Sequence, residues 1–190
     1  NYTASVIGCS RQDAKAHTFK PLYGGVSGTE DQKRYYNAFK EKYNGVTKWH
    51  EELQKHAVMK KHIRLPSGRQ YAFPQARWTD WGTATDRTAI CNYPVQGFAT
   101  ADLLPMSLIL LDRKVRELGM MSVICNTVHD SIVMDVYPGE EKQCIDVMAE
   151  CMLAIPMESK ERYGIEYNMP VGIELKIGKN WLDLEEVLTV

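Results

Sequence analysis

Residues 127–136 (TVHDSIVMDV) place His129 and Asp130 side by side within an apolar run. Apolar residues alternate after this pair, at Ile132, Met134 and Val136. The alternation predicts a β-strand with the two polar residues at its rim. A carboxylate there needs a partner if it is buried, because an unpaired buried charge is very costly. Asp130 is therefore a candidate metal ligand, an ion-pair partner or a turn residue, and the segment alone leaves all three open.

As a metal ligand, Asp130 would suit Mg²⁺, a hard cation that prefers oxygen ligands and substrate phosphates. A two-metal phosphoryl-transfer site needs further carboxylates, because it holds ions on both the attacking and the leaving oxygen. Acidic residues follow nearby, at Asp135, Glu140 and Glu141. Asp135 lies four residues after Ser131, so in a strand we expect it to face away from Asp130.

A second pattern joins cations to aromatics at intervals of four residues, at Arg11, Lys15, Phe19 and Tyr23. Four residues is slightly more than one helical turn, so these side chains should line one face of a helix. Cations neutralise phosphate charge and an aromatic can pack on a base or sugar, which suits a nucleoside triphosphate. The alternative is an amphipathic helix with solvated cations and a buried aromatic pair, and spacing alone favours this alternative.

A third pattern places amides four residues apart, at Asn92 and Gln96, with Arg87 upstream. Amides and a guanidinium can contact the acceptors that recur in every base pair of a DNA minor groove. The alternative is a helix start, with Asn92 as its N-cap and Pro94 in its first turn. The two interpretations are compatible.

The helices and strands that position these residues are predicted from the period of the hydrophobic residues and from the glycines and prolines that interrupt it. Helices are predicted at residues 10–23, 29–42, 46 to about 60, 85 to about 118, and 139–155. Hairpins are predicted at 64–74 and 121–136, and a strand at 169–181. Pro105 should kink the longest helix or start a new one, because it lacks a backbone N–H. Helices first, then strands with packing helices, indicate an α+β fold.

Composition indicates a soluble globular protein, with 44% hydrophobic and 25% charged residues. We expect no apolar run long enough to span a bilayer and no signal peptide. Five cysteines without metal-ligand spacing favour reduced, buried thiols.

Residues 1–80 carry 14 Lys and Arg against 7 Asp and Glu, whereas residues 81–190 carry 9 Lys and Arg against 17 Asp and Glu. This asymmetry suggests a basic, anion-facing part followed by an acidic one.

Taken in chain order, these patterns resemble the C-terminal part of family A DNA polymerases, the family of bacterial DNA polymerase I and many phage replicases. RQDAKAHTFKPLYGG resembles motif B of that family, Arg-x3-Lys-x3-Phe/Tyr-x3-Tyr-Gly. NYPVQG resembles its Asn-x-Pro-x-Gln-Gly stretch, and VHDS resembles motif C, usually Val-His-Asp-Glu. VGIELKIGKNW resembles the chain end. The resemblance spans nearly the whole chain, and several motifs in order make it far more specific than one.

The resemblance implies a role for each matching residue. Residues 1–80 would form the fingers subdomain, with a nucleotide-binding helix at 10–24, and residues 81–190 would form part of an antiparallel palm sheet with packing helices. The incoming triphosphate would be contacted by Arg11 and Lys15, its sugar by Phe19, and the templating position by Tyr23. The primer–template minor groove would be contacted by Arg87, Asn92 and Gln96. At the primer end, His129 would lie near the terminus and Asp130 would bind Mg²⁺.

The sequence departs from the family at three positions. Arg87 precedes Asn92 by five residues, where the family usually has four. Pro21 falls inside the fingers helix and should bend its last turn. Ser131 replaces the usual Glu of motif C. His-Asp-Ser also occurs in single-subunit phage RNA polymerases, but those usually carry methionine at the position of Phe19.

The resemblance also implies a missing part. Only ten residues precede Arg11, so motif A with the other catalytic Asp, and the thumb, are expected outside these 190 residues. We therefore expect a split DNA polymerase that is completed by an N-terminal partner chain or fragment. Its substrates would be dNTPs and primer–template DNA, and it would use two Mg²⁺ ions. We expect it in the cytoplasm of a phage-infected bacterium. A non-catalytic nucleic-acid-binding remnant is the alternative, favoured by Ser131. We expect the surface towards the missing part to be large and apolar.

Overall fold

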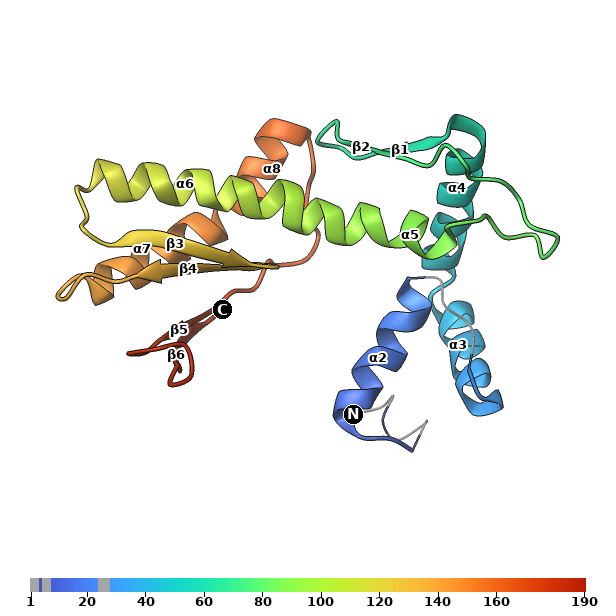
Figure 1. The fold of residues 1–190 in the computed structure, drawn as a ribbon, viewed down its shortest axis with the longest axis horizontal. Coiled ribbons are helices and arrows are strands. Elements are labelled where there is room, and N and C mark those ends of the chain that lie inside the picture. Colours follow the sequence, from blue (N-terminus) through green and yellow to red (C-terminus); the bar gives the residue numbers. More distant parts are fainter. Residues whose placement is uncertain (1–3, 5–7, 24–27) are drawn as a thin grey trace. The chain divides into compact units, whose positions relative to one another are not determined.

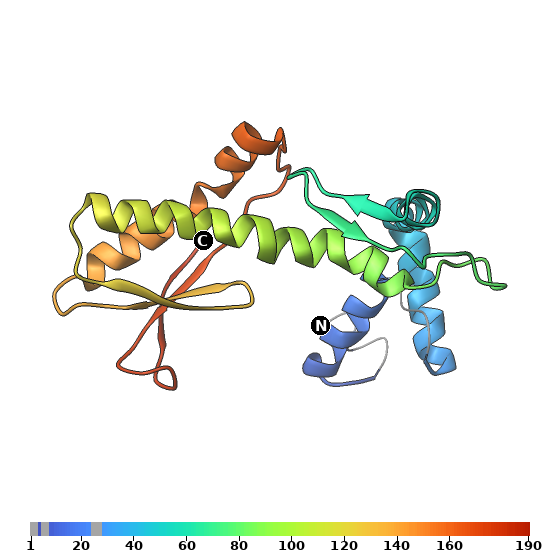
Figure 2. The ribbon, with the colours of Figure 1, turned by 45° about the horizontal axis from the view of Figure 1, so that its top comes forward.

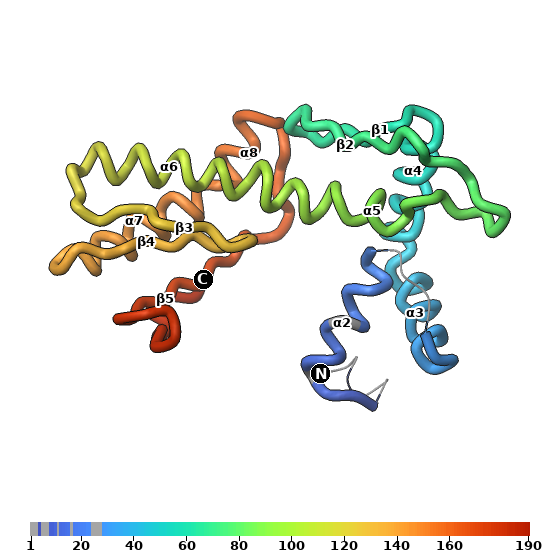
Figure 3. Tube along the Cα trace, in the orientation of Figure 1, coloured from blue at the N-terminus to red at the C-terminus, as the bar shows by residue number. Residues whose placement is uncertain are grey.

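The computed structural model describes residue 4, residues 8–23 and residues 28–190. The chain forms two compact units, Asn1–Gln96 and Gly97–Val190, each with its own secondary structure (Figure 1; Figure 3 traces the same path). The prediction of an α+β fold is confirmed: helices dominate the first unit and antiparallel hairpins with packing helices form most of the second. The sequence-based boundary at residue 80 and the names fingers and palm remain predictions.

The first unit begins with three helices, α2 (Arg11–Leu22), α3 (Glu30–Lys42) and α4 (Asn44–Lys60). Two of them begin at side-chain caps, which satisfy backbone N–H groups that have no partner inside the helix. The hydroxyl of Ser10 accepts from the backbone N–H of Asp13 at 3.1 Å. Thr29 and Gln32 form a reciprocal capping box at the start of α3.

A hairpin and a helix complete the first unit. Strands β1 (His62–Arg64) and β2 (Gln70–Ala72) pair antiparallel, as predicted around the Pro-Ser-Gly turn. Helix α5 (Arg87–Asn92) follows, and one π-helical turn, η1 (Tyr93–Gly97), ends the unit. The core buries side chains from α4, the hairpin, the loop after it and α5, namely Ala57, Ile63, Phe73, Ala76, Ala84 and Ile90.

The second unit contains η2 (Ala99–Leu103) and α6 (Leu104–Glu117), then the hairpin β3 (Val123–Val128) and β4 (Ser131–Asp135). Helices α7 (Glu141–Leu153) and α8 (Ile155–Tyr163) come next, followed by the hairpin β5 (Glu174–Ile177) and β6 (Glu185–Thr189). One face of β3–β4 packs against α6 and α7 (Figure 2). The core of this unit centres on Leu111, Ile132, Val147 and Cys151.

Pro105 was predicted to kink the longest helix or to start a new one, and it lies where the helix type changes inside one continuous helical run, Arg87–Glu117. Pro105 lies in the first turn of α6, where a missing N–H costs nothing inside that helix. The turn before it is π-helical: the N–H of Leu104 reaches back five residues to the carbonyl of Ala99. All five cysteines are free, and three are buried, at Cys91, Cys144 and Cys151.

The expectation that no apolar run is long enough to span a bilayer was too strict. Among the described residues, the helical run Arg87–Glu117 is long and apolar enough to cross a membrane by length and composition. Core helices of soluble proteins pass the same test, so one such run is weak evidence for a membrane span. The predicted strand at 169–181 was also too long, since β5 covers only its middle, and α8 and β6 were not predicted.

Candidate active site

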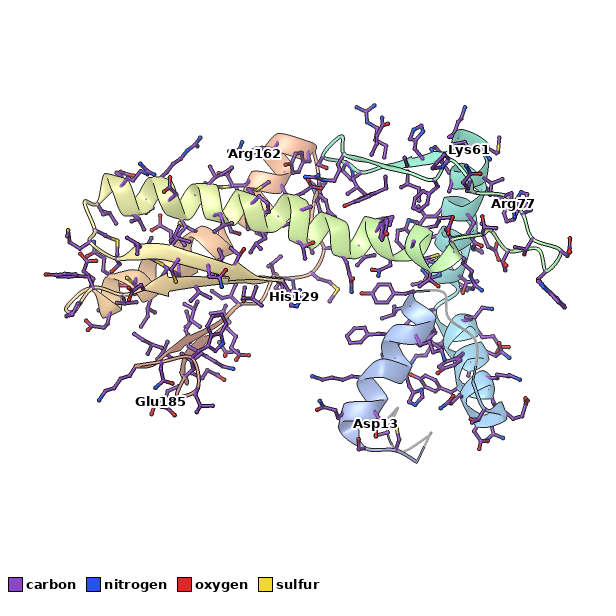
Figure 4. The ribbon with its side chains drawn as sticks, in the orientation of Figure 1. Asp13, Lys61, Arg77, His129, Arg162 and Glu185 are labelled. Carbon is purple, nitrogen blue, oxygen red and sulfur yellow. The ribbon has the colours of Figure 1, made fainter. Side chains whose placement is uncertain are left out.

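The loop between β3 and β4 contains only His129 and Asp130, whose side chains are exposed (Figure 4). Val128 and Ser131 form the last pair of the ladder before it. His129 adopts a left-handed backbone, with φ of 55°, a conformation rare for residues other than glycine but more frequent for histidine than for most. The hydroxyl of Ser131 donates to the carbonyl of Val128 at 2.9 Å, closing the turn. The hairpin thus presents one carboxylate at a braced, solvent-facing tip.

The packing of β4 fixes where this tip points. Ile132 and Met134 face the core of the second unit together with Ile124 of β3, as the alternation in the sequence predicts. At Cys125 the ladder shifts register between Ile124 and Asn126, a β-bulge that the sequence pattern does not reveal. A strand anchored through alternate side chains cannot slip by one residue without exposing its apolar face. The position of Asp130 is therefore set by the core beneath the hairpin.

The neighbouring acids do not join Asp130. Asp135 pairs with Val123 at the far end of β4, and five residues of strand span about 15 Å. Glu140 accepts hydrogen bonds from the backbone N–H groups of Met121 and Ser122, at 2.9 and 2.8 Å, and from the Ser122 hydroxyl at 2.6 Å. Within the described part of the chain, no group of three or more His, Cys, Asp or Glu side chains could hold a metal ion.

Glu140 is a structural residue that the sequence pattern did not reveal. Its hydrogen bonds tie the start of β3 to the residue before α7. They also lower the pKa of the Glu140 carboxyl: the backbone N–H of Met121 is the main cause, and the Ser122 hydroxyl is the second. The Ser122 hydroxyl also accepts from the N–H of Tyr137 at 2.9 Å. The signal available in sequence is the Pro-Gly-Glu-Glu run, which predicts a helix start but not the partner of its first Glu.

Helix α2 carries the residues of the second pattern. Lys15 is exposed and Phe19 is 51% exposed, and the ring of Phe19 stacks on that of Tyr23 with centroids 6.3 Å apart. The helix packs through its other side, where His17 Nδ1 lies 2.9 Å from the hydroxyl of Tyr36. The alternative of a buried aromatic pair is therefore wrong for Phe19. Arg11 begins this helix, and its side chain lies outside the described part of the structure.

Helix α5 and the following π-helical turn carry the third pattern. Asn92 is the last residue of α5, not its N-cap, so the helix-start interpretation of Asn92 is wrong. Asn92 Oδ1 and Arg87 Nε are buried and have no hydrogen-bond partner, a state that costs about 1–3 kcal/mol per group unless something else satisfies it. Gln96 is exposed within η1. Pi-helical turns occur frequently at functional sites.

The candidate residues divide between the two units. The first unit holds the α2 series with Arg87, Asn92 and Gln96, and the second holds His129 and Asp130. Each group is presented by a hydrogen-bonded element of its own unit.

Comparison with known proteins shows which family the chain belongs to. The family model of DNA polymerase family A covers residues 3–183. The chain is 31% identical over 169 residues to the DNA polymerase of Bacillus phage SP01, covering 85% of this chain and 18% of that protein. It is 29% identical over 185 residues to DNA polymerase I of Lactococcus lactis subsp. cremoris, covering 91% of this chain and 20% of the relative. The chain thus spans about a fifth of the length of these relatives.

A solved structure supports the fold. The POL domain of Pol1 from M. smegmatis, in complex with DNA primer-template and dNTP, superimposes with a TM-score of 0.68 at 20% sequence identity. The match covers 80% of this chain and 30% of that one. Together with the family match over nearly the full sequence, it shows that the chain belongs to DNA polymerase family A.

Proposed function

We propose that these 190 residues are the fingers and C-terminal palm portion of a template-directed DNA polymerase. The observation that carries the proposal is the carboxylate of Asp130, held at an exposed hairpin tip whose turn is closed by Ser131 and whose strands are anchored in the core. Asp130 lies in the loop, outside the paired residues of the ladder and outside the core of the second unit.

The residues present fit one ligand of a Mg²⁺ site. The carboxylate of Asp130 is a hard oxygen donor that faces solvent, so a hydrated ion with substrate phosphates can reach it. When bound, Mg²⁺ would supply charge stabilisation at the reacting oxygens. Asp130 would hold the ion, and His129 would lie beside the primer terminus. The second carboxylate would come from outside these residues, since the neighbouring acids are remote or already hydrogen-bonded.

The face of α2 would bind the incoming dNTP. Lys15 and Arg11 would neutralise triphosphate charge, since cations one helical turn apart can contact successive phosphates. Phe19 would pack against the sugar, and Tyr23 would cover the templating position. The exposure of Phe19, whose ring stacks on the partly buried ring of Tyr23, supports this assignment, because a pair that served only the core would be buried.

The polar segment of α5 and η1 would follow the primer–template minor groove. Asn92 and Gln96 offer amides that can contact N3 and O2 acceptors regardless of sequence. A buried Oδ1 without a partner at Asn92 supports a role in orienting its amide towards a ligand. Gln96→Ala should weaken binding of primer–template with little sequence preference, and weakening at a single base pair would contradict groove tracking.

The missing carboxylate and thumb would come from a polypeptide segment outside these residues, on this chain or on another. The second unit offers a surface for it: a groove of about 1190 Å³ lined mainly by residues of β4, α7 and the hairpin β5–β6. Two-stranded sheets leave open edges that can pair with an added strand. The exposed apolar side chains Trp181 and Leu184 line the same groove.

Primer extension tests the proposal. In the complete polymerase that contains these residues, Asp130→Asn should lower the rate of dNTP incorporation at least about a hundredfold, because it removes a metal ligand. Asp146→Asn, an exposed acid on α7 outside the groove lining, is the control and should stay within about threefold. Equal rates for Asp130→Asn and the unmodified polymerase would sink the assignment and favour the non-catalytic remnant suggested by Ser131. Faster incorporation of rNTPs than of dNTPs would favour the RNA polymerase alternative.

A further inference from the structure

One π-helical turn joins the two amides of α5 and η1. Asn92 ends α5, and Gln96 lies inside η1. A π turn is rare and persists where the surrounding structure holds it. Pro94 supplies part of the reason, because it lacks the N–H that would bond the carbonyl of Ile90 in an α-helix. The missing bond interrupts the α-helix, but it does not decide which way the wider turn points.

Tyr93, the first residue of η1, packs on two aromatic rings at the hairpin β1–β2. Its ring centroid lies 5.1 Å from that of Tyr71, at an interplanar angle of 53°, and 5.9 Å from that of Phe73, at 31°. Both separations fall in the range that aromatic pairs prefer. Tyr93 is still 43% exposed, so burial alone does not fix its ring. The two ring contacts give it a definite direction.

The two rings under Tyr93 are themselves fixed. Tyr71 pairs with Ile63 across the ladder, and Phe73 is only 6% exposed in the core of the first unit. The backbone N–H of Phe73 also donates to the carbonyl of Lys61 at 2.7 Å, one residue beyond the paired strands. The hairpin is thus a firm support for Tyr93.

The width of the turn separates Tyr93 from Gln96. In an α-helix, residues three apart lie on the same face, so Gln96 would follow Tyr93 towards the hairpin. A π turn takes more residues per turn, which rotates the two side chains apart. In the structure, Tyr93 contacts the hairpin while Gln96 is exposed. A change from a π turn to an α turn would therefore move the Gln96 amide.

We infer that Tyr93 is a positioning residue: by packing on Tyr71 and Phe73 it holds the π turn, and it thereby directs the Gln96 amide towards primer–template DNA. Tyr93 acts through Gln96 and needs no contact with the DNA itself. The inference rests on the proposed function for the identity of the ligand, whereas the hold of Tyr93 on the turn is a property of the first unit alone.

The affinity of the complete polymerase for primer–template DNA tests the inference. Tyr93→Ala should weaken this affinity about tenfold, roughly the loss of one hydrogen bond. Tyr93→Phe keeps both ring contacts and should stay within about twofold of the unmodified polymerase. Tyr71→Leu removes the nearer ring from the other side but leaves an apolar side chain in its place, and it should weaken the affinity about threefold.

Tyr43→Ala is the matched control. Tyr43 is 44% exposed and its ring centroid lies 4.7 Å from that of Phe39, so it resembles Tyr93 in exposure and packing, but it lies between α3 and α4 and outside the turn. Both alanine variants should lower Tm, and only Tyr93→Ala should weaken DNA binding. Equal weakening by the two would overturn the inference, because a general loss of stability would then explain it.

A double-mutant cycle separates positioning from direct contact. If Tyr93 acts through Gln96, the variant with both Tyr93→Ala and Gln96→Ala should bind DNA no more weakly than Gln96→Ala alone. Losses that add would overturn the inference, because Tyr93 would then act independently of Gln96. Hydrogen exchange supplies a readout without DNA: residues 93–97 should exchange faster in Tyr93→Ala than in Tyr93→Phe.

A failure of the proposed function would look different. If Gln96→Ala leaves the DNA affinity unchanged, the minor-groove contact is wrong, and hydrogen exchange decides whether Tyr93 holds the turn. Faster exchange confined to residues 93–97 in Tyr93→Ala would support that hold. Exchange of this segment equal to that in Tyr43→Ala would overturn it, whatever Gln96→Ala does to the DNA affinity.

Discussion

At the residue scale, Ser131 separates two interpretations of the hairpin tip. Its hydroxyl donates to the Val128 carbonyl, so it closes the turn that presents Asp130. A serine with this bond contributes to geometry and need not contact a metal ion, whereas the family's usual Glu at this position would add a charge. A role in closing the turn and a role in the reaction predict different losses of stability and of rate when the Ser131 hydroxyl is removed.

Ser131→Ala should reduce the free energy of unfolding by about 1 kcal/mol, the typical value of one side-chain hydrogen bond. The rate of dNTP incorporation should fall by only a few fold, because the Asp130 carboxylate remains. Chemical denaturation and single-turnover extension measure the two effects. A loss of rate as large as that of Asp130→Asn would show that the hydroxyl contributes to the reaction itself.

Lys15 gives a second prediction for a single residue. Lys15→Ala should raise the KM for dNTP by about tenfold, because it removes a charge-assisted contact to phosphate. Lys20→Ala is the matched control: Lys20 lies on the same helix, but its ammonium sits 5.6 Å from the ring centre of Tyr36. Steady-state kinetics with varied dNTP measures both, and an unchanged KM in Lys15→Ala would contradict the assignment of α2 to the nucleotide.

At the scale of helices and strands, the sequence predicts those elements that a local pattern of residues determines. Helices α2, α3 and α4 and the hairpin β3–β4 follow from periodicity, caps and turn residues, and all are confirmed. Strand β6 was missed although it pairs with the preceding strand, because no short turn signal precedes it and its fit depends on Gly172 and Gly178, which allow the close approach of the returning chain. A Cβ on Gly178 would lie 2.0 Å from the carbonyl oxygen of Asp183, and one on Gly172 would lie 2.9 Å from that of Val190. Such contacts cannot be seen in a local pattern.

The candidate site divides in the same way. Asp130 and the α2 series were found because chemistry and spacing coincide in one short segment each. The buried, unpartnered Nε2 of His50 was not, because neither burial nor the absence of a partner can be read from a local pattern. The role of Glu140 likewise depends on a partner 18 or 19 residues away in sequence.

The link that Glu140 makes between β3 and α7 should give the second unit an acid-sensitive step. The folded-state pKa of Glu140 lies below its usual 4.5, mainly because of the Met121 N–H. A lowered pKa means that the stabilisation is fully present above pH 4.5 and is lost as the pH falls through the folded-state value. Glu140→Gln should therefore lower Tm at pH 7, and its difference from the unmodified protein should shrink towards pH 3.

Thermal unfolding followed by circular dichroism between pH 3 and pH 7 measures this effect. Glu161→Gln, an exposed substitution on α8, provides the control and should leave Tm unchanged across the range. A difference between Glu140→Gln and the unmodified protein that stays constant with pH would exclude the ionised carboxylate as the source of the stabilisation.

At the scale of the whole molecule, the two parts differ in charge and in what they leave uncovered. Residues 1–80 are basic and carry the helix proposed to bind the nucleotide, whereas the acidic remainder includes a groove lined by β4, α7 and the hairpin β5–β6, with Trp181 and Leu184 exposed in it. Isolated two-stranded sheets are marginal in water, and an exposed apolar lining favours a further polypeptide segment. Covering the groove would therefore both stabilise the second unit and bring in the carboxylate that Asp130 lacks.

Trp181→Glu tests this link between assembly and activity. Trp181 lines the groove and is 58% exposed, so a charge there should leave the unit folded but impair docking of the missing segment and reduce primer extension at least about tenfold. Met157→Glu, at a side chain 59% exposed on α8 and outside the groove lining, should preserve both docking and extension. Hydrogen exchange of β4 and β5 in the complete polymerase reports the docking directly, since a docked segment slows exchange there. Equal exchange and equal extension in the two variants would mean that the groove is not where the polymerase is completed.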